Sequence, residues 1–198
     1  ELSDEITVLR DGAVSGTTQP SATSREQLAE MMVGRPVNLT RTLDEQSVGA
    51  PKLQVNNLTV TGDRGTTAVN NVSIDVHAGE IVGIAGVSGN GQRELAEAIF
   101  GLREIAVGSI TLKGTTIISP TPQQVRQLGL AYVPEERMRD GAIGEFTVAE
   151  NLMLVDYEAP PFTQRGLLNA TAIEQRSGEL IDGYGVKTPT MHTPTRHL

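Results

Sequence analysis

The chain has 198 residues, which is enough for one ordinary domain core, or for one domain and part of another. Its net charge is −8 at pH 7 and its pI is about 4.9, and this acidic balance argues against a broad nucleic-acid or anionic-lipid surface, which needs clustered Lys and Arg. The absence of cysteine excludes disulfides and thiolate metal sites, and the longest apolar run is too short to span a bilayer.

The first fifty residues predict a hairpin, a helix and a linker. Residues 6–9 and 14–18 are short β-like runs, and Asp11-Gly12 between them is a strong hairpin signal. Ser24 and Gln27 have the spacing of a capping box, so we expect a helix to begin there and to end at Gly34. Residues 36–50 are polar with little periodicity, which is typical of a linker, and we place a domain boundary near Ala50.

A second unit is expected from Lys52 onward. Apolar residues from Leu53 to Val60 suggest a strand that is interrupted at Asn56-Asn57, and residues 72–76 alternate as in a half-buried strand. Residues 81–85 form a continuous apolar run, which predicts a strand buried on both faces. A glycine-rich loop follows, and then a helix is expected over residues 92–100, with Gly101 as its end.

The remaining elements complete an α/β pattern. We expect strands at residues 109–114 and 130–133 and helices that begin at Thr121, Thr147 and Thr171, the last two through capping boxes. Residues 187–198 are rich in Thr and Pro and show no period. The order strand, glycine loop, helix, strand predicts an α/β core preceded by an antiparallel β portion.

One motif carries chemistry. The residues Gly86, Val87, Ser88, Gly89, Asn90, Gly91, Gln92 and Arg93 have the spacing of the phosphate-binding P-loop, G-x-x-x-x-G-K-[ST]. Glycines allow several backbone N–H groups to turn inward around an anion, and the start of the next helix adds its partial positive charge. Taken by itself, this match leaves open an ordinary glycine-rich turn between a strand and a helix.

Two positions of the motif depart from its pattern. Gln92 stands where Lys should reach the outer phosphates, and Arg93 stands where a Ser or Thr hydroxyl should hold Mg²⁺. A neutral amide cannot neutralise developing charge, and a guanidinium cannot ligate a cation. We therefore predict a loop that can hold phosphate through its backbone and is poor at hydrolysis.

Other polar residues are weaker candidates. His77, His192 and His197 are not at metal-ligand spacing and are interpreted as surface residues. The acidic residues Asp140, Glu145 and Glu150 are interpreted as residues of solvated turns or helix starts. Ser88 has no nearby His and lies in the phosphate loop, so we do not expect it to act as a nucleophile.

Several segments together resemble the ATP-binding subunits of ABC importers, in particular the fused type in which one chain holds two nucleotide-binding domains. Residues 71–86 resemble the strand–turn–strand that leads into that family's P-loop. Residues 89–95 resemble the degenerate P-loop of the second domain, more in the nucleoside-type branch than in the ribose or galactose type. Residues 132–137 resemble the Q-loop region, and residues 147–152 resemble the start of the helical subdomain.

The first segments also have counterparts in that family. Residues 4–12 resemble the segment after the switch histidine of the first domain, and residues 31–35 resemble that domain's end. The resemblance implies that residues 1–35 end a preceding ABC domain, residues 36–50 are a linker, and residues 51–198 begin a second domain. Both ends of the chain are accordingly expected to be cut, with the signature loop and the Walker B strand beyond Leu198.

The resemblance implies a P-loop ABC nucleotide-binding fold of the α/β class, and ATP and Mg²⁺ as cofactors of the whole protein. It implies no catalytic residue and no metal ligand in this chain, which would be inactive alone. Expected partners are transmembrane permease subunits, the first ABC domain and, indirectly, a solute-binding protein, without nucleic acid. The expected location is cytoplasmic, peripheral on the inner face of the cell membrane. Residues 138–154 are expected to face the permease. For Val148, Leu152 and Leu154, the alternative is ordinary packing in the core.

Two further positions depart from the family pattern. Glu135 occupies the place of the Q-loop glutamine, where a carboxylate could ligate Mg²⁺ but would repel a triphosphate; a solvated charged loop is the alternative. The stretch between Val60 and Val69 lacks the aromatic residue on which adenine stacks in this family. Two other functions remain open, a non-catalytic nucleotide-binding or interaction module and an ABC ATPase unrelated to transport.

Overall fold

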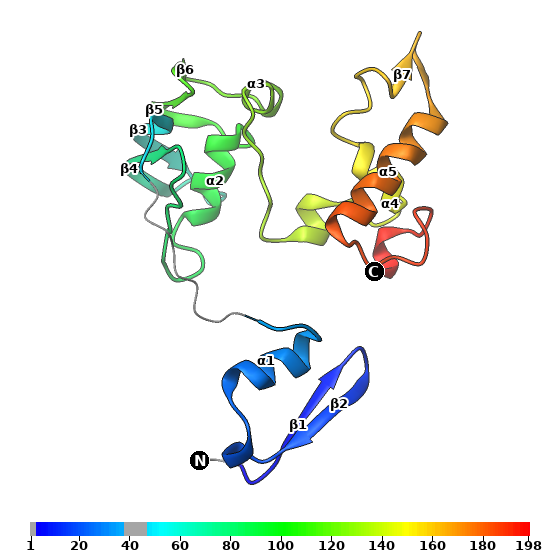
Figure 1. The fold of residues 1–198 in the computed structure, drawn as a ribbon. Coiled ribbons are helices and arrows are strands. Elements are labelled where there is room, and N and C mark those ends of the chain that lie inside the picture. The colour runs from blue at the N-terminus through cyan, green and yellow to red at the C-terminus, as the bar shows by residue number, and fades with distance from the viewer. Residues whose placement is uncertain (1–2, 38–46) are drawn as a thin grey trace. The chain divides into compact units, whose positions relative to one another are not determined.

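A computed structural model of the chain describes residues 3–37 and 47–198 (Figure 1). The chain divides into two compact units, Glu1–Gly49 and Ala50–Leu198, and each is described by itself. The predicted linker at residues 36–50 falls largely on residues 38–46, which lie outside the described residues.

The first unit contains the predicted hairpin. Strands β1 (Ile6–Arg10) and β2 (Ala13–Thr18) pair antiparallel, with a register shift after Val8. Asp11 and Gly12 have φ of 50° and 77°, which is the positive-φ pair of a tight hairpin turn. The Asp-Gly signal is thus confirmed, because only residues that tolerate positive φ fit both central positions.

Helix α1 (Arg25–Val33) packs beside this hairpin. The capping box is confirmed: the Ser24 hydroxyl accepts from the Gln27 amide, and the Gln27 side chain accepts from the Ser24 amide. Gly34 ends the helix in the left-handed conformation with φ 81°. The Ser15 hydroxyl donates to the Met31 carbonyl at 2.9 Å, which ties β2 to the helix.

A four-stranded antiparallel sheet is the centre of the second unit. The spatial order is β4-β3-β5-β6, and the strands are β3 (Pro51–Thr61), β4 (Thr67–His77), β5 (Ile105–Leu112) and β6 (Thr115–Ile117). The interruption predicted at Asn56-Asn57 is present as a register shift, with Asn57 at φ 50°. Gly108 of β5 passes so close to this irregularity that a Cβ there would collide with the carbonyl oxygens of Asn56 and Asn57.

Two helices cover this sheet. Helix α2 (Gln92–Phe100) contacts β3 and β4, and α3 (Pro122–Gln127) adds Val125 to the same core. Figure 1 shows α2 and the sheet side by side. The buried core consists of Val55, Leu58, Val60, Val69, Leu95, Ala98, Ile110, Leu112 and Val125. The predicted limits of α2 are confirmed, since Gly101 stops it in the left-handed conformation.

The last third of the chain is mainly helical. Helix α4 (Val148–Met153) packs against α5 (Ala170–Tyr184), and a short hairpin of β7 (Thr163–Gln164) and β8 (Leu167–Leu168) lies between them in sequence (Figure 1). The capping box at Thr147 is confirmed. The one expected at Thr171 is wrong, because the N-cap lies two residues earlier, at Asn169, a stronger N-cap whose side chain accepts from the Ala172 amide.

Two predicted strands are absent from the part of the chain that the structure describes. Residues 81–85 and 130–133 form no strand and have no ladder partner, and Ile81 and Val133 are 94% and 84% exposed. A strand buried on both faces requires hydrogen-bonded neighbours. The described strands pair only within their antiparallel sheets, and neither run pairs with them, not even at the open edges of β4 and β6.

Candidate functional site

The glycine loop reaches α2 through a tight turn. The Asn90 amide donates to the Val87 carbonyl at 3.2 Å, and Gly89 and Gly91 have φ of 90° and 96°. Gly91 is buried against β4, where a Cβ would collide with the Ala68 carbonyl oxygen. Glycine is therefore required at this position both for its conformation and for the close approach of two backbones.

This turn leaves several amides available to a ligand. Among the described residues, the N–H groups of Ser88, Gly89, Gly91, Gln92 and Arg93 donate to no other backbone group. They lie at or just before the first turn of α2, where unsatisfied amides give the helix end a partial positive charge. The arrangement can hold an anion the size of a phosphate.

The Gln92 side chain bends back over the loop. Its Nε2 donates to the Val87 carbonyl at 3.3 Å and lies against Gly86, where a Cβ would collide with it. Gln92 thus points into the loop as a P-loop lysine would, but it supplies a neutral donor in place of a charge.

Arg93 belongs to a network of ion pairs. Its Nη2 lies 2.6 Å from Asp63 Oδ2, and its Nε lies 3.6 Å from Glu97 Oε1. Arg103 contacts the same two carboxylates, with its Nη2 at 2.7 Å from Asp63 Oδ1 and 2.7 Å from Glu97 Oε2. Hydrogen bonds from Arg103 and then Arg93 lower the pKa of Asp63 below its ordinary value. The guanidinium of Arg93 is thereby drawn toward the turn between β3 and β4.

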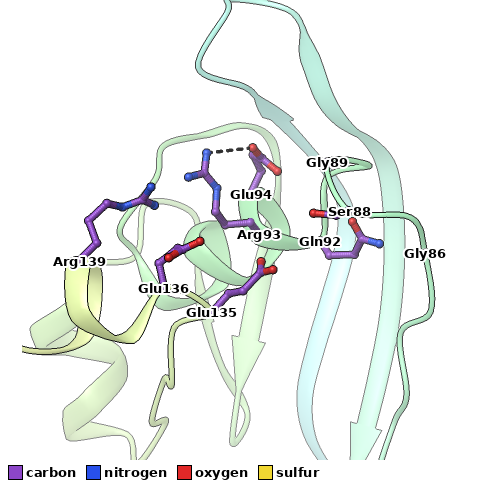
Figure 2. A pocket seen from close by; sticks show the side chains of 9 residues that line it. All are labelled: Gly86, Ser88, Gly89, Gln92, Arg93, Glu94, Glu135, Glu136 and Arg139. Carbon is purple, nitrogen blue, oxygen red and sulfur yellow. Dashed lines mark hydrogen bonds and ion pairs between the residues drawn. The ribbon is translucent and has the colours of Figure 1, made fainter. Parts of the chain in front are cut away.

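A cleft of about 480 Å³ opens beside the loop (Figure 2). Its lining consists of Gly86, Ser88, Gly89, Gln92, Arg93, Glu94, Glu135, Glu136 and Arg139. Three carboxylates thus face two guanidinium groups, and the second of these, Arg139, is paired with Asp140 at 2.8 Å. Backbone amides are therefore the main attraction for an anion in this cleft, while the charged side chains oppose a triphosphate.

The structure brings Glu135 to the phosphate loop, 42 residues after Arg93 in a different segment. The ring of Tyr132 packs against Phe100 of α2 in a tilted arrangement, with centroids 5.4 Å apart, and this contact places the segment beside the helix. Burial raises the pKa of Tyr132. Figure 2 shows Glu135 and Glu136 directed toward the start of α2.

A second cleft of about 550 Å³ lies on the β3–β4 side of the loop. It is lined by Gly62, Asp63, Arg64, Thr66, Thr67, Ala68, Gly89, Asn90 and Glu94. Among these described residues there is no aromatic ring, so a base entering this cleft finds polar contacts and no stacking surface.

The remaining candidates keep ordinary surroundings. His77 contacts Glu80 at 2.9 Å, and the hydrogen bond from the His77 amide lowers the pKa of that carboxyl. His192 and His197 are exposed. Over the described ranges 3–37 and 47–198, no three His, Asp or Glu side chains converge as a metal site.

Sequence reasoning missed Asp63, Glu97, Arg103 and Arg139. One signal was present, since Arg93 and Glu97 are four residues apart on a helix and therefore share a face. Asp63 and Arg103 are 30 residues before and 10 residues after Arg93, and only the folded sheet brings them together.

Comparison with known proteins assigns this loop to a family. The model of that family, described as ABC transporter, matches residues 69–196, a span that includes the loop, α2 and the helical part. The chain belongs to the ABC transporter family.

Relatives agree with this assignment. The chain is 38% identical to the guanosine import ATP-binding protein NupO of Bacillus subtilis over all of its own length and 39% of that protein. It is 40% identical to the glucose import ATP-binding protein TsgD13 of Haloferax volcanii over 93% of the chain and 34% of that protein. The chain thus spans about two fifths or less of the length of these relatives.

Solved structures show the fold. The dimeric ABC transporter cassette MJ0796 matches with a TM-score of 0.58 at 20% identity, over 74% of this chain and 62% of that one. The ADP conformation of the cassette MJ1267 matches with a TM-score of 0.54 at 18% identity, over 75% of this chain and 59% of that one. The predicted fold class, an α/β P-loop ABC cassette with an antiparallel β portion, is confirmed.

Proposed function

We propose that the chain is part of the ATP-binding subunit of an ABC importer for a sugar or a nucleoside. The observation that carries this proposal is the loop of free amides at the start of α2, in a chain of the ABC transporter family. The relatives named for the import of guanosine, nucleosides, glucose and ribose support the class of solute.

The loop is proposed to bind the phosphates of ATP through its backbone, without turning the nucleotide over. The donor set fits phosphate, because five amides of the loop and helix start lack backbone partners among the described residues, namely those of Ser88, Gly89, Gly91, Gln92 and Arg93. It does not fit Mg²⁺, because Arg93 supplies no oxygen and is held by carboxylates. Gln92 likewise brings no charge to the outer phosphates. We therefore propose a degenerate half-site that binds nucleotide weakly.

The division of labour in the whole protein is also a proposal. Residues 1–35 would end a first ABC domain and residues 51–198 would begin a second one, as in importers of the fused type. Hydrolysis, and the Mg²⁺ that it requires, would then belong to the site that the first domain's P-loop completes. Among the described residues no helix is long and apolar enough to cross a bilayer.

Permease subunits are the proposed partners, with a solute-binding protein reached through them, at the inner face of the membrane. Residues 138–154 contain side chains of both kinds: Val148 is buried, whereas Met138 and Phe146 are exposed. Core packing therefore accounts for Val148, and the exposed apolar residues are the ones available to a permease.

The proposal is tested by titrating ATP into the chain, with and without Mg²⁺, and by assaying phosphate release. We expect weak binding, little effect of Mg²⁺ and no release. Gly89→Ala should weaken binding about tenfold, because it strains a residue at φ 90° in the loop. Gly83→Ala is the matched control, since that exposed glycine lies outside the loop and its added Cβ would meet nothing. Sustained ATP hydrolysis by the purified chain would contradict the proposal that the loop binds nucleotide without turning it over.

A non-catalytic regulatory module is the second candidate. It is favoured because the side chains of Gln92 and Arg93 already bond to other groups of the protein, the Val87 carbonyl and Asp63. The two functions differ in what the complete protein does with the loop. If Gly89→Ala in the full-length protein leaves solute uptake intact and alters only the nucleotide dependence of hydrolysis elsewhere, the loop is regulatory. Loss of uptake together with nucleotide binding supports a part in the transport cycle.

A further inference from the structure

Arg93 stands between two environments. On one side it lines the cleft that contains the free amides of Ser88 and Gly89. On the other side its guanidinium contacts Asp63, which lies in the turn between β3 and β4 and is 61% exposed. Figure 2 shows that the guanidinium extends away from Gln92 and the loop. The position of this cation is therefore determined by competing carboxylates.

Arg103 makes most of the same contacts without Arg93. It reaches Asp63 and Glu97 at 2.7 Å each, and it donates to the Thr61 carbonyl at 3.2 Å. Its side chain is only 18% exposed. The turn thus stays tied to α2 if Arg93 leaves, so the Arg93–Asp63 contact is not needed to hold the turn.

Little free energy is needed for Arg93 to leave Asp63 for another anion. Because Asp63 is largely solvated, its ion pair with Arg93 is of the weak surface kind. The other carboxylates paired with Arg93 lie farther away, Glu94 of the cleft at 3.4 Å and Glu97 of α2 at 3.6 Å. Asp63, at 2.6 Å, is the strongest single partner of the guanidinium.

We propose that Asp63 withholds the Arg93 guanidinium from the phosphate loop, so that Asp63 is a positioning residue that lowers the affinity of this loop for polyphosphate. The inference rests on the proposed function of the loop as a phosphate site. Without Asp63, the guanidinium turns into the cleft that it already lines and adds a charge-assisted donor to the backbone amides. The weak affinity of the degenerate loop is then a consequence of a carboxylate outside the motif.

The test compares Asp63→Asn with the parent chain in titrations with tripolyphosphate and no divalent cation. We expect the variant to bind about threefold to fivefold more tightly, the range of a surface ion pair. The gain should vanish in Asp63→Asn/Arg93→Gln. Asp156→Asn is the matched control: that carboxylate is 62% exposed and pairs with Arg126 at 3.3 Å, so the variant removes the same charge and an arginine–aspartate pair away from the cleft.

Each outcome bears on a different statement. If the parent chain binds tripolyphosphate and Asp63→Asn binds no better, or if Asp156→Asn binds equally more tightly, the role of Asp63 is refuted and the proposed function stands. If neither the parent nor any variant binds, the proposed function fails and this inference fails with it. NMR of arginine side chains reads the pairing without a ligand: the Arg93 Nη–H resonances should move in Asp63→Asn, because Nη2 is the atom that contacts Asp63. Unmoved resonances in a folded variant would also refute the proposal.

Discussion

Two apolar segments of the second unit differ in burial. Ile110 in β5 is completely buried, whereas Ile81, in a run that is at least as apolar, is 94% exposed. β5 has a hydrogen-bonded neighbour on each side, β3 and β6, and the run at residues 81–85 has none among the described strands. Composition thus specifies which residues can be buried, and pairing with neighbouring strands decides which of them are.

The helical part of the second unit adds a third situation. Helix α4 has a strong local signal, the capping box at Thr147, and it also finds a distant partner within the chain. The amides of Val148 and Ala149 donate to the Thr193 and Met191 carbonyls at 3.0 and 2.9 Å. This region is ordered by local and long-range contacts together, which residues 81–85 lack.

The largest expected effect comes from changing the same residue type in both segments. Ile110→Ala should destabilise the second unit by about 3 kcal/mol, because it leaves a cavity in the sheet core. Ile81→Ala should change the free energy of unfolding by less than about 0.5 kcal/mol, because an exposed side chain loses no packing. Urea denaturation, together with hydrogen exchange of the β3 and β5 amides, measures the change in the free energy of unfolding for both variants.

This comparison fails if Ile81→Ala costs as much as Ile110→Ala. Such a result would mean that residues 81–85 are packed against a partner in solution, and a concentration dependence of the effect would identify that partner as a second copy of the chain.

The next largest effect is expected at Asn151, whose side chain joins α4 to the residues before it and to Thr195. The Asn151 Nδ2, which carries two hydrogens, lies within 2.9 to 3.2 Å of four acceptors, the Ile143, Phe146 and Thr147 carbonyls and the Thr195 hydroxyl. Its Oδ1 accepts from the Ile143 amide at 2.8 Å. Asn151→Ala should therefore cost about 2 kcal/mol.

The matched control is Asn70→Ala, at an exposed residue of β4. Increased hydrogen exchange of residues 191–198 in Asn151→Ala, with that of β3 and β5 unchanged, would locate the loss. Uniform acceleration of exchange over both regions would show that α4 and the sheet unfold as one unit. It would contradict the view that the helical part and the sheet are stabilised separately.

Sequence reasoning succeeded where the determinant is local. The hairpin turn at Asp11-Gly12, the caps at Ser24, Thr121 and Thr147, and the limits of α2 all depend on residues within one turn of chain. It failed for residues 81–85 and 130–133, because pairing depends on strands far away in sequence. The candidate site divides in the same way, since its loop was predicted and the pairing of Arg93 with Asp63 and Arg103 with Glu97 was not.

A smaller gain in stability is expected at Ser177 of α5. Its side chain is completely buried, and its Oγ has no hydrogen-bond partner among the described residues. Ser177→Ala removes an unsatisfied hydroxyl and places a stronger helix former in the helix, so the free energy of unfolding should rise by about 1 kcal/mol. Thermal denaturation of the two proteins measures the change. A loss of stability would mean that the hydroxyl is satisfied in solution, for instance by water.

The smallest expected effect concerns the local capping of α4. The hydrogen bond that Glu150 accepts from the Thr147 amide, at 2.8 Å, lowers the pKa of this carboxyl below its ordinary value of 4.5. A carboxyl whose pKa is depressed in the folded protein stabilises the fold above its unfolded pKa, and this contribution disappears as the pH falls through the folded pKa. The stability that Glu150 adds should therefore be complete above about pH 4.5 and lost below it.

Glu150→Gln isolates that charge, because an amide oxygen can still accept from the Thr147 amide while the side chain no longer titrates. The stability difference between the parent chain and the variant, measured by urea denaturation from pH 3 to pH 7, should be present at neutral pH and shrink below pH 4.5. The variant Glu158→Gln removes an exposed carboxylate for which no such backbone bond is formed among the described residues, and it should not reproduce this profile. If the difference for Glu150→Gln were constant over the whole range, the charged form would have no preference for the folded helix. The hydrogen bond of the cap would then stabilise α4 equally with a charged or a neutral acceptor, and its contribution to the free energy of unfolding would not depend on pH.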